Sequence, residues 1–76
     1  MYCELAVRAG EAGALRGYSD KMIEQSLCIL AKESATGING GDARKFAYCI
    51  TGTRYFLREF ERRFPGRDSE IVLGKC

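Results

Sequence analysis

The side chains best suited to binding chemistry recur at a regular spacing in the C-terminal half of the chain. Steps of four, three, four, three and four residues connect Arg44, Tyr48, Thr51, Tyr55, Arg58 and Arg62. This spacing places all six on one face of an α-helix, and we call them the Arg/Tyr stripe. Arginine and tyrosine are enriched at protein-binding hot spots. They also suit phosphate contacts and stacking on bases. The stripe is therefore the candidate site for a partner or ligand.

Two structural explanations compete with a binding role for the stripe. In the first, these side chains simply cover a solvated helix face. In the second, Tyr48 and Tyr55 pack against the N-terminal segment, since amphipathic side chains commonly lie along apolar surface. Among binding roles, the sequence favours a protein partner over a nucleic acid or another phosphate-bearing ligand. The stripe holds only three arginines, whereas a dominant phosphate-binding face makes roughly 6–10 contacts.

The charge distribution adds a modest preference for an anionic partner. The formal net charge of the chain is only +2, which by itself implies no partner class. Residues 43–67, however, hold seven basic side chains against two acidic ones, Glu59 and Glu61. Such an asymmetry favours association with negatively charged surfaces.

The sequence contains no recognisable catalytic arrangement. It has no histidine, which excludes Ser-His and Cys-His nucleophile pairs. The glycine-rich run at 37–41 lacks the lysine and hydroxyl residue of a phosphate-binding loop. Glu59 and Glu61 point to different sides of a helix, so they form no carboxylate pair. We expect no enzyme activity and no cofactor.

The cysteines are widely separated and form no CxxC pair. They stand at Cys3, Cys28, Cys49 and Cys76. A zinc site would need thiolates from all of these scattered positions, so we predict no metal site. Disulfides would suit a secreted protein, but the first 15 residues do not resemble a secretory signal. We therefore expect reduced thiols, with Cys28 and Cys49 semi-buried, and a cytoplasmic location. No stretch approaches the roughly 20 apolar residues of a membrane span.

A long amphipathic helix over 42–64 must position the stripe. An apolar seam with the same four-three alternation runs on the side opposite the stripe, through Phe46, Ile50, Thr53, Leu57, Phe60 and Phe64. Asp42 can cap the N-terminus of this helix. Pro65 and Gly66 end it, because proline cannot continue the hydrogen-bond ladder.

A second amphipathic helix is predicted over 19–36. Ser19 or Asp20 can cap it, and Ile23, Leu27 and Leu30 share one face. The glycine-rich loop at 37–41 then reverses the chain, which predicts an antiparallel helical hairpin.

The N-terminal segment, residues 1–16, is harder to assign. Its alanine, leucine, glutamate and arginine content favours a helix. The alternation of Cys3, Leu5 and Val7 with other residues is strand-like, and a strand would pair with residues 70–73 of the C-terminal tail, 65–76. We favour the helix.

Together these patterns predict a single all-α domain over residues 1–76, in which the hairpin and the N-terminal segment form a helical bundle. A chain this short buries only about 60% of its unfolded surface, and two helices cannot bury four phenylalanines. A homodimer is therefore expected. The predicted function is that of a small non-enzymatic regulatory protein, an inhibitor or adaptor, that occupies a protein partner. The alternative is binding of nucleic acid or a phosphate-bearing ligand through the stripe.

Overall fold

The chain folds into three α-helices and a short 3-10 helix, with no strand among the described residues. The computed structural model describes residues 2–41 and 43–67. The helices are α1 (Tyr2–Glu11), the 3-10 helix η1 (Ala14–Gly17), α2 (Asp20–Gly40) and α3 (Ala43–Arg63). The predicted all-α fold is confirmed, and the N-terminal segment is helical rather than a strand. The tail run at 70–73, named as a possible strand partner, lies outside the described residues.

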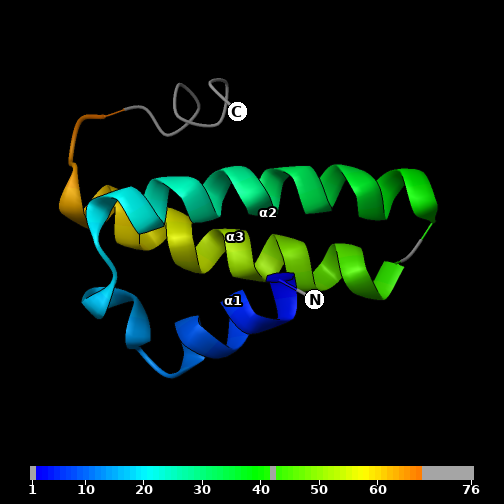
Figure 1. Cartoon of the computed structure of the whole chain (residues 1–76), viewed down its shortest axis with the longest axis horizontal. Helices are drawn as coiled ribbons and strands as arrows, with labels where there is room; N and C mark the ends of the chain where they lie inside the picture. Colours follow the sequence, from blue (N-terminus) through cyan, green and yellow to red (C-terminus); the bar gives the residue numbers. More distant parts are fainter. Residues whose placement is uncertain (1, 42, 68–76) are drawn as a thin grey trace.

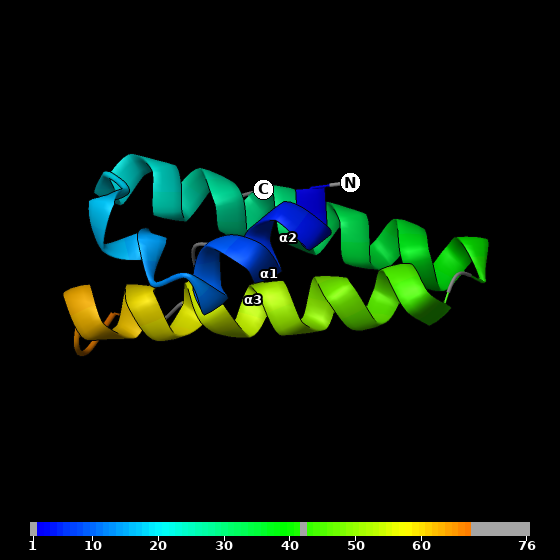
Figure 2. The same ribbon diagram turned by 90° about the horizontal axis from the view of Figure 1, so that it is seen from below.

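Helices α2 and α3 form the predicted antiparallel hairpin, and α1 covers one of its faces. Figure 1 shows α2 and α3 side by side along their length. In Figure 2 the same molecule is turned so that α1 lies in front of the hairpin. α1 packs mainly against α3 and only lightly against α2. Among the described residues, no helix combines the length and the apolar character needed to cross a membrane.

Helix α2 is longer than predicted, because it runs through the glycine-rich segment as far as Gly40. A helix interior tolerates glycine at a cost of about 1 kcal/mol relative to alanine. The ladder ends where the backbone turns left-handed, at Gly41 with φ of 71°. A residue without a Cβ adopts this conformation easily. The five-residue loop predicted at 37–41 was therefore wrong in extent, and the predicted cap Asp42 lies outside the described residues.

The other helix ends follow the sequence closely. The Ser19 hydroxyl oxygen accepts a hydrogen bond from the Met22 amide at 3.2 Å, which makes Ser19 the N-cap of α2. Helix α3 ends at Arg63, two residues before Pro65. Beyond it, the Arg67 guanidinium lies over the Phe64 ring, 4.8 Å from its centre, and pairs with Glu24 on α2 at 3.1 Å.

The buried face of α3 is rotated from the predicted seam. Of the six seam residues only Phe60 is fully buried, and Ile50 is 38% exposed. The buried residues of α3 are Cys49, Gly52, Phe56, Glu59 and Phe60. Because α1 packs on one flank of α3, the buried arc turns toward that flank. The spacing of apolar residues did not predict this buried face, because the face includes Gly52 and Glu59, which carry no apolar signal.

Two glycines allow α1 to approach α3 closely. A Cβ added at Gly52 would lie 3.0 Å from the Ala6 Cβ and 3.2 Å from the Cys3 carbonyl oxygen. Gly52 therefore permits a close approach of α1 to α3. At Gly10, an added Cβ would collide with the Tyr55 ring. Since that ring fills the space beside Gly10, α1 is fixed on α3 at both ends of their contact.

A disulfide between Cys3 and Cys49 also joins α1 to α3. Both residues are fully buried, and Cys28 is disulfide-bonded as well. The predicted reduced thiols were therefore wrong for the three described cysteines. The pairing could not be predicted from the sequence, because Cys3 and Cys49 are 46 positions apart and are brought together only when α1 docks on α3.

Candidate partner-binding groove

Three adjoining hollows follow the surface of α3 and include residues of α1 and η1. The largest, about 380 Å³, is lined by Val7 and Glu11 of α1 and by Arg44, Ala47, Tyr48 and Thr51 of α3. The second, about 190 Å³, is lined by Thr51, Arg54, Tyr55 and Arg58. The third, about 210 Å³, is lined by Gly10, Gly13, Leu15, Arg16, Tyr55, Arg58, Glu59 and Arg62. Neighbouring hollows share lining residues, Thr51 in one case and Tyr55 and Arg58 in the other, and the middle hollow is lined by α3 alone. We call this row of three hollows the groove.

All six residues of the Arg/Tyr stripe line this groove. The largest hollow is bordered by Arg44, Tyr48 and Thr51, and the other two are bordered by Tyr55, Arg58 and Arg62. At about 1.5 Å per helical residue, the 18 steps from Arg44 to Arg62 span about 27 Å. The stripe is thus the α3 wall of a groove rather than an isolated helix face.

The spacing of the stripe residues could not predict the opposite wall of the groove. It comes from α1 and η1, through Val7, Glu11 and Arg16. Arg54 of α3 was also missed, because it lies one position outside the four-three spacing. The net positive charge of 43–67 was the available signal for Arg54. No sequence signal pointed to Val7 and Glu11, because only the packing of α1 brings them to this face.

The tyrosines of the stripe play different parts. Tyr55 is half-buried and packs against Gly10, so the structural explanation offered for it holds in part. Tyr48 is 37% exposed and borders the largest hollow. The Thr51 hydroxyl donates a hydrogen bond to the Ala47 carbonyl oxygen at 3.0 Å, which occupies its proton. Tyr48 is therefore the aromatic side chain most available to a bound molecule.

A carboxylate with two arginines lies at the η1 end of the groove. Arg62 Nη2 donates to one Glu59 carboxylate oxygen at 2.6 Å, and Arg63 Nε donates to the same oxygen at 2.6 Å. Glu59 is only 8% exposed. The hydrogen bonds from Arg62, together with the one from Arg63, outweigh burial and lower the pKa of Glu59 to about 2. The same contact with Glu59 raises the pKa of Arg62.

Glu59 is expected to make folding stability depend on pH in the acid range. Its pKa is about 4.5 when unperturbed and about 2 in the folded chain. The folded state therefore gains stability above pH 4.5 and loses it as the pH falls from 4.5 through 2. Half-exposed Arg62 is screened by solvent, so we expect a contribution of about 2 kcal/mol, below the full value of the shift. Urea unfolding at a series of pH values measures this loss.

A matched pair of variants isolates this contribution from the other carboxylates. Glu59→Gln should flatten the stability profile between pH 5 and 2, because the variant no longer has the group that titrates. Glu61→Gln, on an exposed residue two positions away on α3, should keep the native slope. Equal slopes in both variants would contradict the assignment to Glu59.

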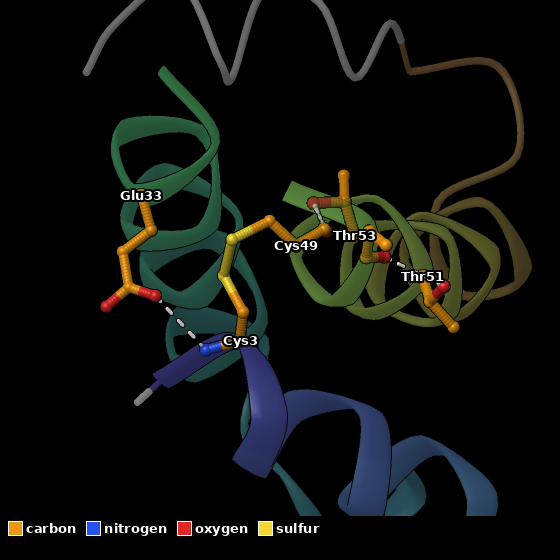
Figure 3. The surroundings of a disulfide bond; sticks show 6 residues. Cys3, Glu33, Cys49, Thr51 and Thr53 are labelled. Carbon is orange, nitrogen blue, oxygen red and sulfur yellow. Dashed lines mark hydrogen bonds between the residues drawn. A yellow bond between two sulfur atoms is a disulfide. The ribbon is translucent and has the colours of Figure 1, made fainter. Parts of the chain in front are cut away.

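Three residues of types that can bind metal ions lie at the other end of α1, where the disulfide meets α2. The ligand atoms of Cys3, Glu33 and Cys49 lie within 4.8 Å of one another. Figure 3 shows the Glu33 carboxylate directed at the first turn of α1, where it accepts a hydrogen bond from the Cys3 amide at 3.1 Å. Both sulfurs are used in the disulfide. In this arrangement Glu33 satisfies a free N–H group at the helix N-terminus and complements its dipole.

No protein-family model matches the chain, and no curated protein or solved structure matches it either. Its function must therefore be inferred from the groove and the residues that line it.

Proposed function

We propose that this protein is a small non-enzymatic binding protein that acts by occupying a protein partner through the groove between α1 and α3. One observation carries the proposal. All six residues of the Arg/Tyr stripe line the three adjoining hollows of the groove, and arginine and tyrosine are enriched at binding hot spots. An inhibitor or adaptor of this kind needs no catalytic group, because its effect comes from covering a surface of its partner.

Nucleic acid, or another phosphate-bearing ligand, is the second candidate for the same groove. The exposed cations Arg44, Arg54 and Arg58 favour it, since arginine binds phosphate well. The apolar and acidic residues of the largest hollow, Val7 and Glu11, weigh against it. A phosphate backbone is repelled by a carboxylate and gains nothing from an apolar wall.

The proposed setting changes with the cysteine chemistry. The cytoplasmic location predicted from the sequence was based on the first 15 residues, which do not resemble a secretory signal, whereas the Cys3–Cys49 disulfide favours an oxidising environment. We propose that the protein works in an oxidising compartment, where such a bond persists. The homodimer stays a prediction. Its argument is weaker than before, because α1 helps to enclose Phe56 and Phe60 within one chain.

Affinity capture with groove variants tests the proposed function. The immobilised oxidised protein is incubated with extract, in parallel with and without nuclease treatment, and bound proteins are identified by mass spectrometry. Tyr48→Ala combined with Arg58→Ala should deplete a specific partner at least about tenfold, since hot-spot truncations cost more than about 1.4 kcal/mol each. Tyr55 is left intact because its ring helps to hold α1.

The matched control is Lys21→Ala combined with Met22→Ala, two exposed residues of α2 away from the groove. This variant should recover the partner as the native protein does. Equal recovery by the groove variant would count against the proposal. Partner loss on nuclease treatment alone would favour the nucleic-acid alternative.

A further inference from the structure

The groove is chemically different at its two ends. In the largest hollow, Val7, Ala47 and the Tyr48 ring supply apolar surface, and Glu11, Arg44 and Thr51 complete the lining. Toward the η1 end the lining becomes cationic, with Arg54, Arg58, Arg62 and Arg16. An occupant of the whole groove therefore needs one apolar part and one charged part.

The charge of the lining is strongly one-sided. Its charged residues are five arginines and two glutamates, Glu11 and Glu59. Glu59 is already paired with Arg62 and with Arg63, which stands behind the groove wall. Arg54 and Arg58, by contrast, are exposed on consecutive turns of α3 and border the same hollow. Their charges are best complemented by carboxylates of a bound molecule.

Glu11 favours a peptide backbone over a phosphodiester backbone in that molecule. This carboxylate borders the same hollow as Val7 and accepts hydrogen bonds but donates none. A peptide backbone offers an N–H donor at nearly every residue, whereas a phosphodiester backbone offers only negative charge. A groove about 27 Å long holds roughly eight extended residues at about 3.3 Å each.

We propose that the occupant of the groove is an acidic peptide segment of about eight residues, with apolar side chains at the Val7 end and carboxylates at the Arg54–Arg58 end. This inference rests on the proposed function and gives its partner a chemical class. Val7, Ala47 and Tyr48 receive the apolar side chains. Arg54 and Arg58 pair with the carboxylates.

Fluorescence anisotropy with defined peptide pools tests this proposal. Each labelled octapeptide has one half drawn from leucine, phenylalanine and tyrosine, placed at either end. The other half is drawn from glutamate and aspartate, from glutamine and asparagine, or from lysine and arginine. The acidic pool should bind at least about tenfold more tightly than the neutral pool, which corresponds to about 1.4 kcal/mol. The basic pool should bind least.

Paired variants place the binding on the groove. Arg54→Gln with Arg58→Gln should weaken binding of the acidic pool about tenfold. Arg8→Gln with Lys21→Gln removes the same charge from exposed positions outside the groove and should leave binding nearly unchanged. Equal weakening by both variants would mean that net charge alone attracts the pool, and would overturn the proposal. So would tighter binding of an eight-nucleotide thymidine oligomer than of the acidic pool.

The two proposals fail in different ways. If the acidic and neutral pools bind alike while the groove variant still loses its captured partner, the partner chemistry is wrong and the proposed function stands. If groove-dependent binding of the acidic pool is found but captured proteins are unaffected by the groove variant, the groove binds acidic peptides and the proposed function fails.

Discussion

Replacing Cys3 with alanine is expected to lower the free energy of unfolding by about 4 kcal/mol. The Cys3–Cys49 bond closes a loop of 46 residues, so its loss restores much conformational freedom to the unfolded chain. Few other contacts can compensate, because α1 has only 10 residues and holds α3 through small side chains and Tyr55. Urea unfolding followed by circular dichroism, without reductant, measures the loss.

Two controls test whether the loss of stability comes from the Cys3–Cys49 bond itself. Cys49→Ala should cost about as much as Cys3→Ala, and the double variant should cost little more than either, because one bond is lost in each case. In excess thiol reductant the native protein and Cys3→Ala should differ little. A variant as stable as the native protein under oxidising conditions would contradict a stabilising role for the bond.

Loss of this disulfide is also expected to weaken binding in the groove. Val7 and Glu11 form the α1 side of the largest hollow, and their positions depend on the docking of α1. The variant is therefore expected to bind the acidic peptide pool more weakly than the native protein, even at temperatures where it remains folded.

The hairpin could be predicted from the sequence because its signals are local. Apolar residues repeat along α2 with a helical period, and Ser19 marks the start of that helix. The end of α2 was less predictable. Residues 37–41 include three glycines, and only the left-handed backbone of Gly41 shows which one ends the helix.

The candidate site could be half predicted. The α3 wall follows from the helical spacing of its own residues, so the Arg/Tyr stripe was visible in the sequence. The α1 wall and the disulfide depend on where a separate helix docks. Small residues at that contact, Gly10 and Gly52, carry no apolar signal, yet they determine how closely α1 approaches. The same packing explains why the buried face of α3 is rotated away from the predicted apolar seam.

Replacing Arg63 with alanine is expected to cost about 3 kcal/mol of folding stability, because a buried charge network is left incomplete. Arg63 is only 12% exposed in its side chain. Besides its bond to Glu59, it donates to the Leu15 carbonyl oxygen at 2.8 Å and pairs with Asp20 at 3.0 Å. One guanidinium therefore joins α3 to η1 and to the start of α2. Urea unfolding at pH 7 measures the cost.

Arg62 offers a matched comparison, because it binds the same Glu59 carboxylate from a side chain that is 54% exposed. Arg62→Ala should cost much less than Arg63→Ala, since solvent can replace its contact and it holds no second element in place. Arg63→Lys should recover little stability, because an ammonium cannot donate in several fixed directions as a guanidinium does. Equal costs for the two alanine variants would mean that Glu59 pairing alone matters. A larger cost for Arg63 would support a role for its additional bonds to Leu15 and Asp20 in holding η1 and the start of α2 on α3.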